Sequence, residues 1–270
     1  MLRIVLALGW SDFVLKYRGS VLGYLWSFLA PFAQFIVILH VFRPFFGVDV
    51  RMYPLYLFLG VILWEFFSVT TSACMTMLLE KAAIIQKVSV PRPLLILAVG
   101  WTNVLVLLTR LSIFAVAAVI YRVQADASML YLPVLLLQLL MLTLGVGMLL
   151  SSFSLRYRDI PHLWYILLQA LFWLTPIAYT ARGVGPVLAG LAGAPGRLWT
   201  ANIGSWIDFF IQFQPLSIFF SAARRSLLPF AAGLPPSPLH MAGLTLLCMT
   251  VFAAGYVVFW HRSRYFIQEF

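Results

Sequence analysis

Residues 16–31, KYRGSVLGYLWSFLAP, mark the point where the chain passes from a basic leader into hydrophobic sequence. Lys16 and Arg18 stand directly before the apolar run, as expected for cations held in the headgroup layer on one side of a membrane. Tyr24 and Trp26 suit the aromatic belt at that interface. The stretch is typical of the flank of a first transmembrane helix. We also interpret it as a joint between a surface helix and that span.

The composition indicates an integral membrane protein. Of 270 residues, 63% are hydrophobic and only 10% are charged, which is more apolar material than one soluble core of this size can bury. In a soluble protein the net charge of +10 would suggest a nucleic-acid partner. Here most basic residues fall in short segments between hydrophobic stretches, where they orient the chain, so we expect no nucleic-acid partner.

The leader, residues 1–20, predicts an amphipathic helix that lies along the membrane surface. Leu6, Trp10 and Phe13 share one side at helical spacing, whereas Asp12 and Lys16 fall elsewhere. No cleavage site of small residues follows the apolar run, so we keep the segment in the mature protein. A plain solvent-facing leader is the alternative.

Six stretches are long and apolar enough for transmembrane helices, which need about 20 mainly apolar residues. They cover residues 22–43, 54–79, 94–120, 131–153, 161–181 and 240–260. An even number of spans places both termini on the same side. The leader, the loops 80–93 and 154–160, and the tail 261–270 hold most of the basic residues outside the spans, so we expect them in the cytoplasm.

The region 182–239, between the fifth and sixth spans, is apolar and aromatic but interrupted by polar residues. Asn202, Asp208 and Pro215 would leave polar groups unsatisfied in a lipid-facing helix. We therefore expect re-entrant or interfacial helices on the outer face, with a seventh and eighth span as the alternative. The sequence predicts an all-α integral membrane protein. Its single transmembrane domain covers residues 1–270, with spans one to five in 22–181.

Prolines mark several helix ends. Pro91 and Pro93 close the loop 80–93, which reads as a short amphipathic helix or as an ordinary basic loop, and fix the start of the third span. Asp159 suits the positive end of the fifth span, with Pro161 in its first turn. Pro176 lies well inside that span, so we expect the helix to kink or end there near the outer leaflet.

Two ionisable residues lie inside predicted spans, where they are costly enough to suggest a function. Glu65 in the second span and Arg110 in the third lie at similar depths, because a helix rises about 1.5 Å per residue. We predict an ion pair between them. The alternative is that Glu65 faces a water-filled conduit.

The sequence contains no catalytic or metal-binding pattern. The four histidines are scattered, and Cys74 and Cys248 lie in apolar runs without CxxC spacing, as expected for small packed hydrophobes. There is no GxxxxGK[ST] phosphate loop, so the chain should not hydrolyse ATP itself. We expect a transport protein rather than an enzyme, with no metal or cofactor bound by this chain.

Three blocks carry a family resemblance. KYRGSVLGYLWSFLAP, VPRPLL (90–95) and RYRDIPHLWYILLQALFWLTPIAY (156–179) resemble blocks of the ABC-2 family of ABC transporter permeases, in family order. The similarity is strongest to the branch that exports O-antigen, capsule and teichoic acid. The chain has Gln214 before Pro215, where the family often has asparagine. The resemblance implies a homodimer of this chain with two copies of a separate ATPase subunit, which would bind ATP and Mg.

The resemblance also implies roles for individual residues. Candidates for coupling to the ATPase are Lys81, Lys87, Pro91 and Arg92. Candidates for receiving a lipid pyrophosphate at the cytoplasmic mouth are Arg3, Lys16, Arg18, Arg156 and Arg158, unless these charges only set topology. Candidate aromatics along a glycan conduit are Tyr24, Trp26, Trp64, Phe67, Trp164, Phe172, Trp173 and Tyr179, although any one of them could face lipid or pack helices instead.

The expected function is ATP-driven export of a lipid-linked polysaccharide across the bacterial inner membrane. Nucleotide binding would close the ATPase dimer, and the coupling helices would pass that motion to the conduit. One alternative is an ABC-2 permease for a drug or a lipid. A less favoured alternative is an ion-coupled transporter that uses Glu65 and Arg110, because the spans show no evident inverted repeat.

Overall fold

The computed structural model describes residues 2–19, 23–46, 52–81, 91–124, 127–154, 156–179, 209–211, 213–228 and 238–263. These residues are helical apart from short turns and one bent segment, residues 175–179. The long helices are α1 (Leu2–Tyr17), α2 (Trp26–Phe46), α3 (Tyr53–Glu80), α5 (Arg92–Ile120), α6 (Leu132–Ser154), α7 (Ile160–Leu174), α10 (Pro215–Leu227) and α11 (Pro238–Ser263). Two short 3₁₀ helices, η1 (Gly23–Leu25) and η2 (Ala127–Tyr131), precede α2 and α6.

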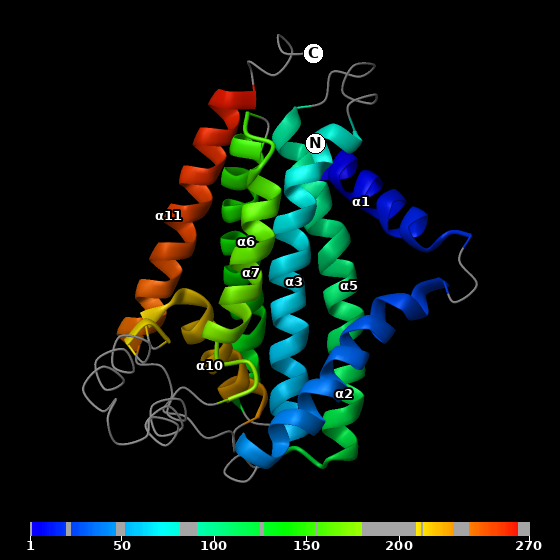
Figure 1. Ribbon diagram of the computed structural model, residues 1–270, viewed down its shortest axis with the longest axis vertical. Coiled ribbons are helices and arrows are strands. Elements are labelled where there is room, and N and C mark those ends of the chain that lie inside the picture. Colours follow the sequence, from blue (N-terminus) through cyan, green and yellow to red (C-terminus); the bar gives the residue numbers. More distant parts are fainter. Residues whose placement is uncertain are drawn as a thin grey trace, which may run out of the picture.

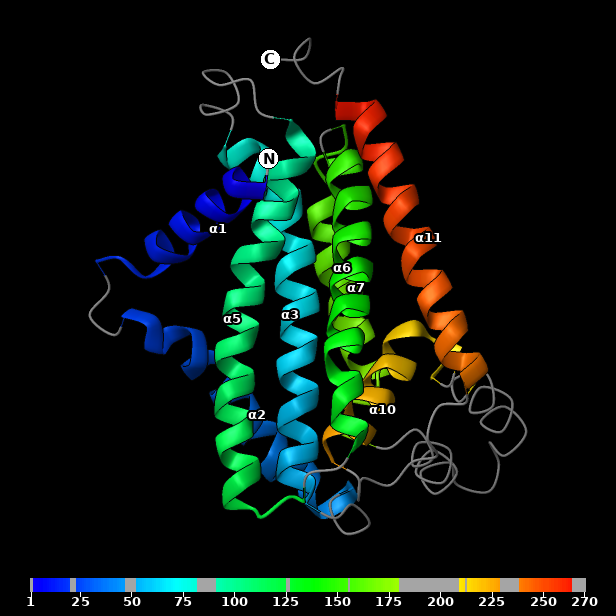
Figure 2. The same cartoon turned by 180° about the vertical axis from the view of Figure 1, so that it is seen from behind.

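Helix α3 forms the centre of the bundle. It is flanked by α5 and α6, and α11 lies along the far side of α6 (Figure 1, Figure 2). Helix α1 packs against α5, whereas α2 leans away from the bundle and contacts mainly α3. Helix α7 packs against α3 and α6.

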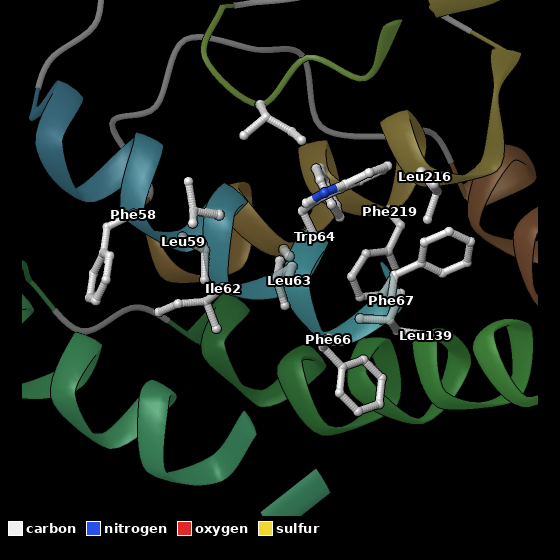
Figure 3. Packing of buried hydrophobic residues seen from close by; sticks show 14 of the residues in the cluster. Phe58, Leu59, Ile62, Leu63, Trp64, Phe66, Phe67, Leu139, Leu216 and Phe219 are labelled. Atoms are coloured by element: carbon white, nitrogen blue, oxygen red, sulfur yellow. The ribbon is translucent and has the colours of Figure 1, made fainter. Parts of the chain in front are cut away.

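The core surrounds α3 because apolar residues lie on several sides of this helix, as expected for a central helix. Leu57, Leu59 and Ile62 are fully buried although they lie on different sides of α3. Figure 3 shows side chains of α3 reaching toward α6, where Leu139 lies, and toward α10, where Phe219 lies.

Four helical segments among the described residues are long and apolar enough to cross a membrane. They are Tyr53–Leu78, Arg92–Ile120, Ala127–Ser154 and Met241–Ser263. These correspond to the predicted second, third, fourth and sixth spans. The predicted first and fifth spans correspond to shorter apolar helical segments, Pro31–Val41 within α2 and Ile160–Leu174. The protein is thus an all-helical membrane protein with four candidate spans among these residues.

The prolines end or start helices where the sequence places them. Pro91 precedes the first residue of α5 with an extended backbone, and Pro93 follows in the first turn. Asp159 is the N-cap residue of α7, and its side chain makes no capping hydrogen bond within the described structure. Helix α7 ends at Leu174, and Thr175 before Pro176 is extended. The predicted break near Pro176 is therefore present as a helix end.

The two ends of the bundle carry different residues. The end where α3 and α11 finish and α5 begins, which we call the basic end, carries Arg3, Lys81, Arg92, Arg156, Arg158 and Arg262 (Figure 1). The opposite end, the distal end, holds the start of α3, the end of α5, and α10. Most of the region 182–239 falls outside the described residues, but α10 belongs to it and packs at the distal end against α3, α6 and η2.

Candidate functional site: a groove between α2, α3 and α7

A groove of about 1210 Å³ lies between α2, α3 and α7. One wall comes from α3, where Ser68, Ser72 and Thr76 recur at every fourth position and so share one face of the helix. Gln34 of α2 and Gln169 of α7 add amide groups from the other two walls. Hydroxyl and amide groups therefore follow the length of the groove.

Aromatic rings line the groove beside these polar groups. Trp64 of α3 and Phe172 of α7 meet edge to face with ring centroids 5.6 Å apart, and Trp173 follows on α7. Tyr165 lies further toward the start of α7 and is exposed. Aromatic faces next to hydrogen-bonding side chains suit a ligand that has both apolar faces and hydroxyl groups.

Three of the eight predicted conduit aromatics, Trp64, Phe172 and Trp173, line this groove. Phe67 and Trp164 instead pack behind it with ring centroids 6.2 Å apart, and the Trp164 indole N–H donates to the Thr71 hydroxyl at 3.1 Å.

The other three predicted aromatics lie elsewhere. Tyr179 is buried and donates its hydroxyl to the Trp173 carbonyl at 2.7 Å. Trp26 is exposed in the first turn of α2. The side chain of Tyr24 lies outside the described residues.

The intramembrane charges form the ion pair that the sequence predicts. The Arg110 guanidinium donates to a Glu65 carboxylate oxygen at 2.5 Å, and both side chains are largely buried. Lys16 of α1 lies at the same place, because it lines a small cavity of about 60 Å³ together with Glu65 and Arg110. Partial burial and the like charge of Arg110 lower the pKa of Lys16, and Glu65 partly offsets this.

Lys16, which the sequence predicts in the headgroup layer, lines this cavity and lies away from the basic end. The α5 residues that line this cavity run from Asn103 to Arg110, which places it roughly 17–27 Å along the helix from Arg92 at the basic end. Lys16 is thus separated from Arg156 and Arg158, which are exposed at the basic end. Arg3 and Arg18 are also exposed. The five predicted mouth cations do not form one cluster.

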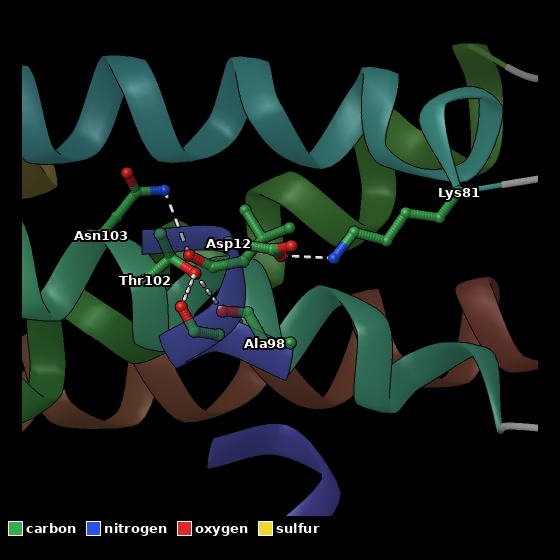
Figure 4. Close-up of polar contacts among 7 residues, drawn as sticks. Asp12, Lys81, Ala98, Thr102 and Asn103 are labelled. Atoms are coloured by element: carbon green, nitrogen blue, oxygen red, sulfur yellow. Dashed lines mark hydrogen bonds and ion pairs between the residues drawn. The ribbon is translucent and has the colours of Figure 1, made fainter. Parts of the chain in front are cut away.

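Helix α1 is fixed to the bundle by polar contacts (Figure 4). Asp12 forms an ion pair with Lys81 at the end of α3, and the Thr102 hydroxyl of α5 donates to the Gly9 carbonyl at 3.0 Å. A Cβ atom at Gly9 would lie 2.7 Å from the Trp101 ring, so only glycine allows this approach. The packed side of α1 holds Val5 and Gly9, which leaves the predicted apolar stripe with Leu6 and Trp10 exposed.

The residues predicted to couple the chain to an ATPase lie at the basic end where they are described. Pro91 and Arg92 start α5, and Lys81 follows α3. Lys81 also holds α1 through Asp12, a contact that charge patterning did not reveal. Lys87 lies outside the described residues.

The sequence did not single out several residues of this region. The fourfold spacing of Ser68, Ser72 and Thr76 is a detectable signal for a polar face on the second span. Arg224, by contrast, is buried in α10, within the region 182–239 for which the sequence predicts re-entrant or interfacial helices. Its partners are backbone carbonyls from distant segments, so no local pattern signals its position.

Known proteins resemble this chain over most of its length. The family model described as "ABC-2 type transporter" matches residues 3–191. An O-antigen export system permease protein RfbA from Myxococcus xanthus is 27% identical over 164 residues, which cover 61% of this chain and 63% of that protein. A protein of the same name from Klebsiella pneumoniae is 25% identical over 172 residues, covering 63% and 66%.

The chain thus spans about two thirds of the length of the curated relatives that it matches. The matched region includes α1 to α7, and with them all three walls of the groove and the Glu65–Arg110 pair. The family model covers most of the sequence, and the fold is all-helical with several candidate spans, as a membrane permease requires. The chain belongs to the ABC-2 type transporter family.

Proposed function

We propose that this chain is the permease subunit of an ATP-driven exporter that moves a lipid-linked polysaccharide of O-antigen type across the bacterial inner membrane. Family membership and the names of the relatives support this assignment. The structural observation that supports the assignment is the groove, in which aromatic rings lie beside hydroxyl and amide groups. A glycan has both apolar ring faces and hydroxyl groups, so it matches this lining.

The proposed arrangement in the membrane has six spans, with α2 and α7 as the first and fifth. Helix α7 is 15 residues long, or about 22 Å, so the non-helical segment after Leu174 would complete its crossing. The basic end would face the cytoplasm, with α1 at the interface and α10 as a re-entrant or interfacial helix of the outer side. Both termini would then be cytoplasmic.

Two copies of the chain would form the conduit. The groove is open on one side of a single copy, and α2 and α7 carry exposed apolar residues such as Val37 and Ile166 beside it. A second copy facing this groove would enclose a path for the glycan. Lipid would suit the same exposed apolar residues, so the homodimer belongs to the proposal.

Energy would come from two copies of a separate ATPase that binds ATP and Mg. The ATPase would contact the basic end through α1 and the segment 80–93, where Lys81, Pro91 and Arg92 lie. Closure of the ATPase dimer would move these segments and so change the width of the groove. Arg3, Arg156 and Arg158 at the basic end would receive the pyrophosphate of the lipid, whereas Lys16, beside Glu65, and Arg18, two residues further along the chain, would act away from that end.

The decisive experiment is purification of the chain with its cognate ATPase, followed by measurement of ATP hydrolysis with and without lipid-linked glycan. We expect glycan to stimulate hydrolysis in the unaltered complex. Ser72→Leu and Gln169→Leu, which replace polar groups in the groove, should reduce that stimulation several-fold. Ser112→Leu is the matched control, because Ser112 is exposed on α5 away from the groove.

Two results would count against the assignment. Stimulation by an unrelated lipid or drug but not by glycan would favour an ABC-2 permease for another cargo. Failure to co-purify with any ATPase, combined with transport that follows an ion gradient, would favour a secondary transporter.

A further inference from the structure

The bent, non-helical segment after α7, residues 175–179, leaves its backbone without helical hydrogen bonds. A helix end leaves its last four carbonyl groups without partners, and an irregular segment adds more. At membrane depth such groups are tolerated only where protein or enclosed water satisfies them. The segment adjoins the groove, because Phe172 and Trp173 directly before it line the groove wall.

Every carbonyl from Leu174 to Tyr179 has a partner within the protein. Thr175 accepts from the Ile177 amide at 2.6 Å, and Leu174 accepts from the Gln214 side chain at 2.8 Å. The Ala178 and Tyr179 carbonyls accept from the hydroxyls of Tyr53 and Tyr56 at 2.7 and 2.9 Å. Side chains of α3 and of the α10 region therefore replace the missing helical bonds.

Arg224 of α10 supplies the two remaining bonds. Its two terminal nitrogens, Nη1 and Nη2, donate to the Pro176 and Ile177 carbonyls at 2.5 and 2.7 Å, and Nε donates to the Tyr56 carbonyl of α3 at 3.3 Å. The guanidinium carbon lies 3.5 Å from the centre of the Tyr56 ring. Only 3% of the residue is exposed, and it forms no ion pair within the described part of the chain.

The position of Arg224 requires glycine at residue 60 of α3. A Cβ atom built on Gly60 would collide with Nη2 of Arg224 and would lie 3.3 Å from the Ile177 carbonyl oxygen. The glycine thus opens the space in which α3, α10 and the non-helical segment meet. A planar guanidinium with several fixed donors can join carbonyls from two segments at once, which an ammonium group cannot do in the same geometry.

We propose that Arg224 is a positioning residue that pins the non-helical segment 175–179 to α3 and thereby holds the distal end of the α7 wall of the groove in place. The inference rests on the proposed function for its consequence, since a loosened wall would let the conduit lose its shape during export. The pinning itself is a property of the fold and is tested without transport.

The test uses Thr175→Cys as a reporter of segment opening. Thr175 is fully buried, cysteine is close to it in size, and the Thr175 hydroxyl has no hydrogen-bond partner among the described residues. The native cysteines Cys74 and Cys248 are also buried and report global unfolding in the same sample. Labelling of the full chain by a maleimide, followed by mass spectrometry, gives the rate at each cysteine.

Two changes should release the segment by different routes. Arg224→Gln removes the guanidinium, and Gly60→Ala displaces it while leaving the arginine in place. We expect each to speed labelling at residue 175 at least about tenfold, because a hydrogen bond to a charged group contributes at least that factor to a local opening equilibrium. Arg224→Lys keeps the positive charge but lacks the planar, forked set of N–H donors, so it should give an intermediate rate of labelling at residue 175.

Two matched controls should leave the rate unchanged. Arg225→Gln alters the exposed neighbour of Arg224 on the same helix, and Gly243→Ala adds a Cβ in α11 that meets no atom within 4 Å. Unchanged labelling at residue 175 in both Arg224→Gln and Gly60→Ala would overturn the inference. Faster labelling at residue 175 together with Cys74 and Cys248 in Gly60→Ala would also overturn it, because that pattern means general unfolding.

The outcome is distinguishable from failure of the proposed function. Selective labelling at residue 175 in a chain whose unaltered form exports no glycan would support the pinning and contradict the assignment. If the unaltered chain exports glycan but neither change alters labelling at residue 175, the assignment is supported and the pinning is contradicted. If the pinning and the proposed function are both supported, Gly60→Ala should also lower glycan export, because it loosens the groove wall beside Phe172 and Trp173.

Discussion

At the scale of single residues, the Glu65–Arg110 pair balances two costs. Each charge alone would be expensive inside a membrane-spanning helix, and the pair is tolerable because the partners meet at 2.5 Å with little exposed surface. Lys16 changes the balance, because the cluster holds two cations around one carboxylate. Removing the carboxylate and removing one cation are therefore not equivalent.

We predict an asymmetric double-mutant cycle at this cluster. Glu65→Gln should lower the free energy of unfolding by about 3 kcal/mol or more, because it leaves Arg110 and Lys16 side by side without their carboxylate. Arg110→Gln should cost less, since Lys16 still faces Glu65. The double variant should be more stable than the sum of the two losses implies. Thermal unfolding of detergent-solubilised protein measures all three, and equal, additive losses would contradict the pair.

Sequence reasoning reached this pair but not its third member. Glu65 and Arg110 stand out because they are ionisable residues in otherwise apolar runs, and helix geometry alone gives their depth. Lys16 reaches them only because α1 runs along α5 from Gly9 onward, and the direction of a leader helix is not encoded in its own pattern. The contacts of Arg224 could not be predicted either, because the carbonyl groups that accept its hydrogen bonds follow the end of α7, far away in sequence.

At the scale of elements, α1 is attached to the bundle by a narrow set of contacts. Gly9 lets its backbone approach α5, the Thr102 hydroxyl binds the Gly9 carbonyl, and Asp12 pairs with Lys81. The exposed stripe on the other side of the helix remains available to lipid. The helical leader was predictable from spacing, but its packed face was not, because a glycine carries no hydrophobic signal.

We predict that Gly9→Val detaches α1 without unfolding the rest. The added side chain would overlap the Trp101 ring and the Ala98 carbonyl, which lie 2.7 and 2.9 Å from a Cβ at this position, and overpacking of this kind costs about 1–3 kcal/mol. Trypsin should then cut after Lys16 several-fold faster, as followed by mass spectrometry. Gly243→Val in α11 is the control with free space around it. An unchanged cleavage rate in Gly9→Val would show that α1 is held by other contacts.

At the scale of the whole molecule, the stretch 16–31 connects a fixed helix to a wall of the groove. Helix α1 is bound to α3 and α5, whereas α2 contacts mainly α3 and contributes Gln34 to the groove. The sequence predicted a joint here from its mixture of cations, glycines and aromatics. In the structure α1 ends at Tyr17 and η1 and α2 begin at Gly23 and Trp26, so the stretch joins two helical segments.

We predict that this joint depends on left-handed backbone at two glycines. Gly19 has φ of +81° and Gly23 has φ of +48°, and a Cβ at either position would meet no atom within 4 Å. Gly19→Ala and Gly23→Ala should therefore strain only the backbone, by about 1–2 kcal/mol each, without disturbing packing or insertion. Because the strain favours a different course of the chain between α1 and α2, glycan export should fall several-fold in each variant and further in the double variant. ATP hydrolysis by the partner should continue, so the ratio of glycan exported to ATP hydrolysed is the quantity to measure, with Gly243→Ala as control. A normal ratio in the double variant would mean that the joint is only a connection and that α2 keeps its place through its contacts with α3.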